Sequence, residues 1–64
     1  MAKLTLTPNI EDGDDFLAEL LAVHDGLTKP DSDALNARLI LTLANHIGDR
    51  DVLAEALRVA ARPR

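Results

Sequence analysis

The sequence predicts an all-α protein of three short helices preceded by an extended arm. Its apolar residues make up 47% of the chain and are mostly leucine and alanine, with one phenylalanine and neither tryptophan nor tyrosine. Leucine and alanine favour helices, and few residues favour strands. Glycines and prolines separate three segments in which apolar residues recur at helical spacing.

The chain is short for an independent fold. With 64 residues it forms one domain, and a domain of this size buries only about 60% of the surface that its unfolded chain exposes. The sequence has no cysteine, which excludes disulfides, a thiol enzyme and a cysteine-based zinc site. Its stability must therefore come from association, a ligand or very good helix packing.

Charge and hydropathy narrow the class of partner. The net charge of −4 and the low isoelectric point, about 4.8, argue against a broad phosphate-contacting surface for nucleic acid. No apolar run approaches the ~18 residues of a membrane span, and the first ten residues lack the apolar core of a signal peptide. We expect a cytoplasmic protein that binds neither nucleic acid nor membrane.

The beginning of the chain has a different pattern from the rest. Over residues 4–7 leucine alternates with threonine, and Pro8 then ends the pattern. A period of two is typical of extended backbone. We expect residues 1–10 to form an arm that lies across helices, pairs with a copy of itself or frays. Residues 11–64 are expected to form a single helical domain.

The first helix is expected to begin after Asp12 and to end near Asp25, before Gly26. Asp12 is a good N-cap, and Asp15 stands at the third helical position, as in a capping box. The acidic residues here face the positive end of the helix dipole. The apolar stripe of an ordinary amphipathic helix follows. It comprises Phe16, Leu17, Leu20, Leu21, Val23 and Leu27.

The second helix is expected to begin at Thr28, which can cap with Asp31, and to end at Gly48. Pro30 fits the first turn. At about 100° per residue, the apolar residues cover roughly two-thirds of the circumference. A helix this apolar is buried on more than one side. These apolar residues are Leu35, Ala37, Leu39, Ile40, Leu41, Leu43, Ala44 and Ile47.

The third helix is expected to begin at Asp49, directly after the Gly48 stop, and to end at Pro63. Its polar stripe carries acids early and bases late, which suits the helix dipole, and Glu55 and Arg58 are spaced to pair. The opposite face carries Val52, Leu53, Ala56, Leu57, Val59 and Ala60.

These helices carry more apolar surface than a three-helix monomer can hide. Monomers rarely leave large apolar patches in water, so we expect a dimeric bundle. Two copies of the hairpin formed by the first two helices would make a four-helix core flanked by the third. A larger, different partner is the rival interpretation. The interface candidates are Leu35, Leu39, Ile40, Leu41, Leu43, Ala44 and Ile47.

Two histidines are the obvious catalytic candidates. His24 and His46 lie near the ends of the first two helices, at opposite poles of an antiparallel hairpin. They cannot share a metal within one chain, and spacing places no further ligand or orienting carboxylate beside them. Favourable placement at the negative end of a helix explains both. We therefore predict neither catalytic residues nor a metal or cofactor site.

A polar cluster surrounds the turn between the second and third helices. It consists of Asn45, His46, Asp49 and Arg50 around Gly48. A structural explanation suffices, in which the glycine adopts the left-handed conformation, Asp49 caps the next helix and Arg50 pairs with a nearby acid. The functional alternative is a docking point for an anion or a partner. A helix-turn-helix is excluded because acidic side chains would face the phosphates.

The stretch "LNARLILTLANHIGDRDVLAEAL", with "LTLTPNI" and "DDFLAELLAVHDGL" before it, resembles a family of small bacterial proteins catalogued only as a domain of unknown function. The similarity covers nearly the whole chain, and "LANHIGDRDVL" is its most distinctive part. The resemblance implies a bacterial source and genes beside flavin-dependent oxidoreductases of aromatic breakdown. It implies no catalytic residues.

Three function classes follow. The leading hypothesis is a non-enzymatic helical interaction protein that forms a homodimer, and its close variant is an accessory subunit that docks on a larger, flavin-dependent oxidoreductase. A small enzyme with a site between subunits, built from His24, His46, Asn45 and Asp49, is the second class. A module that binds a small apolar ligand between helices is the third.

Overall fold

The computed structural model describes residues 3–63 and contains three helices, α1 (Gly13–His24), α2 (Lys29–Ile47) and α3 (Arg50–Ala61). Residues 3–10 belong to neither helix nor strand, and the described chain contains no strand. The predicted all-α class and the three helical segments are confirmed. Residues 1 and 2 of the expected arm lie outside the described residues.

The start of α1 departs from the expected cap. Asp12 occupies the N-cap position, but its backbone is left-handed, with φ 50° and ψ 51°, and its side chain accepts no capping hydrogen bond. A side-chain cap requires extended backbone at this position, so the predicted capping box is wrong. The Asp12 carbonyl still accepts the first helical bond, from the Phe16 N–H at 3.1 Å. At the other end, Gly26 with φ 77° follows α1 as expected.

Both ends of α2 confirm the sequence prediction. The Thr28 hydroxyl accepts a hydrogen bond from the Asp31 N–H at 3.3 Å, and Pro30 lies in the first turn. Gly48 is left-handed at φ 73°, and its N–H donates to the Ala44 carbonyl at 2.9 Å. Glycine adopts this conformation without the steric cost of a Cβ, which ends the helix sharply.

The first turn of α3 is capped by Asp49. One carboxylate oxygen accepts from the Asp51 N–H at 2.9 Å and from the Val52 N–H at 3.0 Å. The helix ends at Ala61, and extended backbone at Arg62 leads to the proline that follows. Both predicted boundaries hold to within one or two residues.

The expected pairing of Glu55 with Arg58 is wrong. The ion pair that forms among residues 3–63 joins Lys29 to Asp33 at 2.9 Å, one turn apart on α2. An exposed pair gains little from Coulomb attraction and loses side-chain entropy, so favourable spacing alone does not form one.

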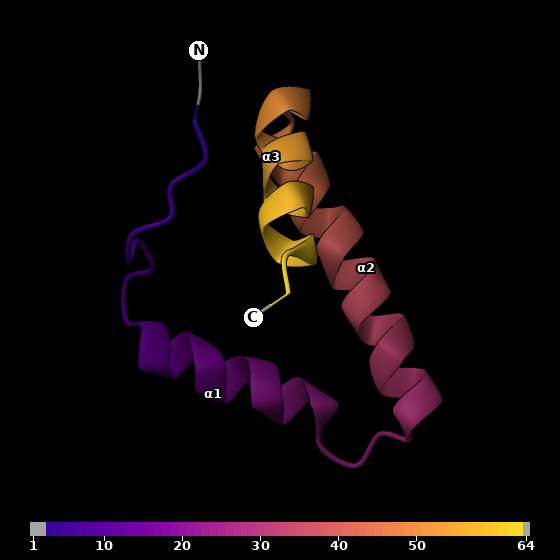
Figure 1. Ribbon diagram of the computed structural model, residues 1–64. Helices are drawn as coiled ribbons and strands as arrows, with labels where there is room; N and C mark the ends of the chain where they lie inside the picture. Colours follow the sequence, from indigo (N-terminus) through magenta and orange to yellow (C-terminus); the bar gives the residue numbers. More distant parts are fainter. Residues whose placement is uncertain (1–2, 64) are drawn as a thin grey trace.

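The helices form an open arrangement (Figure 1). α2 and α3 run antiparallel and side by side, joined by the tight Gly48 turn, whereas α1 extends away from the start of α2. Of the helix pairs in the described chain, α2 and α3 have the most contact with each other, and this contact is small. Val52 of α3 is 9% exposed and is the one buried residue among residues 3–63. The core is therefore confined to the α2–α3 hairpin.

The overall dimensions show the same openness. The radius of gyration is 13.6 Å, whereas a compact domain of this length has about 11 Å. The accessible surface is 5937 Å², against about 4,000 Å² for a compact monomer of this mass. One chain thus leaves roughly 1,900 Å² that a closed fold of the same mass would cover.

Asp49→Ala is expected to lower the free energy of unfolding by about 1–2 kcal/mol, because two N–H groups at the start of α3 lose their acceptor. Urea denaturation followed by circular dichroism, at one fixed protein concentration, measures the change.

Asp12→Gly provides the control. It removes an acidic N-cap side chain that makes no capping hydrogen bond, and glycine readily adopts the left-handed backbone of this position. We expect a change within about 0.5 kcal/mol. An equal loss in the free energy of unfolding for both variants would contradict the conclusion that Asp49 caps its helix and Asp12 does not.

Candidate interaction surface

Large apolar side chains are exposed along the whole chain. They occur on all three helices and on the segment before α1, and contiguous patches of this kind mark interaction surfaces. The exposed large apolar residues are Leu6, Ile10, Phe16, Leu17, Leu21, Val23, Leu27, Ile40, Leu41, Leu43, Ile47 and Leu57.

A groove of about 240 Å³ lies between α1 and α2. Its walls are Phe16, Leu20 and Val23 from α1 and Leu35 and Leu39 from α2, and the Glu19 carboxylate is the one charged group that lines it. The apolar stripes predicted for the two helices therefore face each other. They do not close, because Phe16 keeps 42% of its surface exposed.

The predicted interface residues fall into two groups. Leu35, Leu39 and Ala44 are half-buried within the chain. The others remain exposed, with Leu41 at 70%. This exposed group comprises Ile40, Leu41, Leu43 and Ile47. Its members provide apolar surface that a single chain leaves uncovered, and their role in an interface stays a prediction.

Sequence reasoning did not single out the outward side of α1 or the exposed leucine of α3. Leu17 and Leu21 were included in the apolar stripe of the first helix, and Leu57 in the apolar face of the third, without being distinguished from their neighbours, and all three are exposed. The sequence contained a signal for Leu17 and Leu21. Each directly follows a residue that lines the groove, and it therefore lies about 100° from that residue around the helix.

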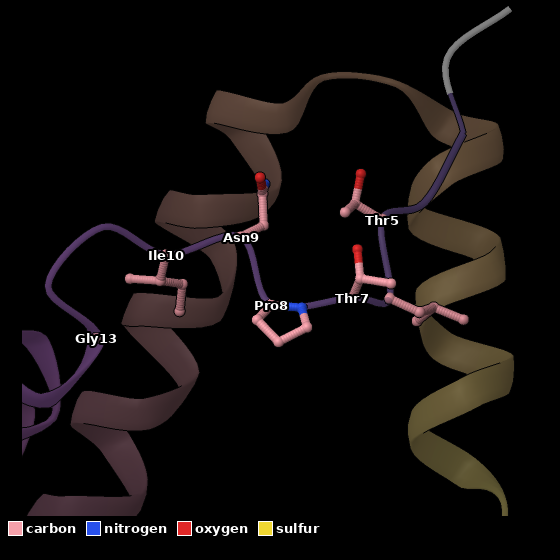
Figure 2. A pocket seen from close by; sticks show the side chains of 7 residues that line it. Thr5, Thr7, Pro8, Asn9, Ile10 and Gly13 are labelled. Carbon is pink, nitrogen blue, oxygen red and sulfur yellow. The ribbon is translucent and has the colours of Figure 1, made fainter.

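A second hollow, of about 590 Å³, lies along the segment before α1. In Figure 2 the polar atoms of Thr5, Thr7 and Asn9 point to one side of the chain, and Pro8 and Ile10 point to the other. All the lining residues come from residues 5–13, and none carries a titratable side chain. This hollow offers neither a general acid nor a general base.

The two histidines lie far apart. His24 is half-buried at the end of α1, and His46 is exposed near the end of α2. The 19 residues of α2 span about 28 Å and separate them (Figure 1). Residues 3–63 contain no group of three or more side chains that could hold a metal ion.

The polar turn between α2 and α3 is explained in part by its structural roles. Asp49 caps α3, and Gly48 takes up a left-handed conformation. Asn45, His46 and Arg50 are exposed. The expected ion pair between Arg50 and a nearby acid is wrong, since no such pair forms in the described part of the chain. Arg50 lies in the first turn of α3, where its side chain extends into solvent.

The comparisons with known proteins identify a family but no function. Residues 4–62 match the model of a family described as a protein of unknown function, DUF2783. The chain belongs to the DUF2783 family. This confirms the resemblance drawn from the sequence. No curated protein and no solved structure matches this DUF2783 chain. Within residues 3–63 of this DUF2783 protein, no helix has the length and apolarity needed to cross a membrane.

Gly48→Ala is expected to lower the free energy of unfolding by about 1 kcal/mol, because alanine is strained at φ 73°. A Cβ would lie at an ordinary 3.8 Å from the Asn45 carbonyl oxygen, so the loss arises from the backbone conformation and not from a clash. Thermal denaturation at fixed concentration measures it.

Gly13→Ala is the matched control, since Gly13 is helical and an added Cβ meets nothing within 4 Å. Alanine there is expected to preserve or raise stability. A loss at Gly13 as large as that at Gly48 would show that the left-handed turn is not what requires glycine.

Proposed function

We propose that this protein is a non-enzymatic helical interaction module that acts as a homodimer, with the exposed apolar side of α2 in the interface. The observation that carries the proposal is the accessible surface of the single chain, about 1,900 Å² above that of a compact monomer. Exposed leucine and isoleucine side chains on all three helices support it.

The uncovered area agrees with what a dimer requires. Obligate homodimers bury roughly 2,000–5,000 Å² in total, and their interfaces resemble a domain core divided between two chains. If each of two copies covered its surplus, the total would be about 3,800 Å². The size of the uncovered area therefore supports a second copy of this chain as the partner.

Closed two-fold symmetry is the commonest way for identical chains to cover such a surface. The structure does not contain the α1–α2 hairpin expected from the sequence, because α1 extends away from α2 (Figure 1). In the arrangement that we propose, α1 and α2 of two copies form a four-helix core and α3 flanks it. The groove lined by Phe16 and Leu39 would then receive side chains of the second copy. The groove holds a single carboxylate, from Glu19, so a catalytic acid–base pair would need groups from elsewhere.

The purified protein is expected to have about twice the 6.9 kDa chain mass in solution. Its melting temperature should rise with protein concentration, because association is coupled to folding. Light scattering and calorimetry over a hundredfold concentration range measure both quantities. A compact, folded single chain at micromolar concentration would contradict the proposal. A chain that stays molten until a larger enzyme, such as a flavin-dependent oxidoreductase, is added would instead indicate an accessory subunit.

Leu41→Glu is expected to dissociate or unfold the dimer, because a carboxylate without a partner in the interface costs several kcal/mol. Leu41 is 70% exposed in the single chain, so a monomer would tolerate the change. Sedimentation measures the mass of the variant.

Thr42→Glu introduces the same side chain one position along α2, on the polar side of the helix. It is expected to leave the dimer intact, with only a small effect from the loss of the hydrogen bond that the Thr42 hydroxyl donates to the Arg38 carbonyl. An unchanged mass for both variants would exclude the Leu41 side of α2 from the interface.

A further inference from the structure

α1 has an exposed outer side that the α1–α2 groove does not use. Leu17 and Leu21, at 51% and 62% exposure, lie on this side, one turn apart. Asp14 precedes them by one turn and Asp25 follows by one turn, and both are exposed. We call these four residues the outer face of α1. An apolar centre is thus bounded at each end by a carboxylate.

α3 has a corresponding outer side with the opposite charge. Leu57 is 70% exposed at its centre. The small residues Ala54 and Ala61 lie beside it at helical spacing, with Arg50 on the same side and Arg58 at the edge that borders the acidic residues of the polar stripe. We call these five residues the outer face of α3. The alanines allow the close approach of another helix.

These two faces complement each other in charge and in apolar character. Within residues 3–63 neither the two aspartates of the outer face of α1 nor the two arginines of the outer face of α3 form an ion pair. Within one chain, the helix pair with the most contact is α2 and α3, and α1 extends away from the start of α2 (Figure 1). An anionic lipid surface is disfavoured as an occupant because the outer face of α1 is acidic.

Two-fold symmetry allows these faces to meet between chains. In the dimer that we propose, α2 of each chain lies near α2 of the other, and α1 of one chain can then approach α3 of the other. The contact occurs twice, which doubles the effect of any charge complementarity.

We propose that the outer face of α1 packs against the outer face of α3 of a second copy, with leucines at the centre and aspartate–arginine contacts at the edges. This inference rests on the proposed homodimer and adds to it the pairing of its helices. The exposed surplus of about 1,900 Å² leaves enough area for this contact in addition to the one at α2.

Charge reversal tests the pairing. One variant carries Asp14→Lys and Asp25→Lys, and the other carries Arg50→Glu and Arg58→Glu. Each variant alone is expected to dimerise about tenfold more weakly than the original protein, because like charges meet at both α1–α3 contacts. An equimolar mixture should form heterodimers with nearly the original affinity, since both contacts are complementary again. Capture of one tagged variant and sedimentation of the mixture measure this.

Glu11→Lys and Arg38→Glu serve as control variants, because they reverse charge outside both faces. Each is expected to dimerise like the original protein, and their mixture should show no preference for heterodimers. If a charge-reversed variant is unfolded alone, recovery of helical circular dichroism on mixing supports the pairing in the same way.

The outcomes separate this inference from the proposed function. If the original protein is a dimer but mixing the two reversed variants brings no recovery, the α1–α3 pairing is wrong and the homodimer stands. If combining all four substitutions in one chain restores stability whereas mixing does not, the two faces meet within one chain, which also overturns the pairing. A monomeric original protein overturns both proposals.

Discussion

The closure of the apolar core is the constraint on which the rest of this structure depends. A single chain buries Val52 and little else, and it leaves most of its large apolar side chains in water. Hydrophobic burial is the main favourable term in folding, and it must offset the conformational entropy of ordering the chain. The helices are defined by their own caps and turns, but the surface that would hold them together lies largely on their uncovered sides.

Much of the fold could be predicted because its boundaries depend on neighbouring residues. Thr28 and Asp49 cap their helices through N–H groups two or three residues away, and Gly48 needs only its own lack of a Cβ to end α2. Asp12 could not be predicted in the same way. Its left-handed backbone depends on how the preceding segment enters α1, which residue type does not determine.

The candidate interaction surface was harder to predict from the sequence than the helix boundaries. Periodicity identified the apolar side of α2, including Leu41, and placed Leu17 and Leu57 on apolar faces, but it did not distinguish the residues of these faces that pack within the chain from those that stay exposed. Which part of an apolar arc meets a neighbour depends on where helices cross, and that is a property of tertiary packing. The groove beside Phe16 needs both α1 and α2 in place, and no pattern within either helix describes it.

The tight connection between α2 and α3 has a consequence for how the protein assembles. Contacts across this hairpin join residues close in sequence, and chains dominated by such contacts fold in microseconds to milliseconds. In the homodimer proposed above, the α2–α3 hairpin would form before two chains meet at low concentration, because encounter between chains slows with dilution. A newly made chain would then be a helical intermediate with exposed apolar sides, and its lifetime would depend on the concentration of other chains.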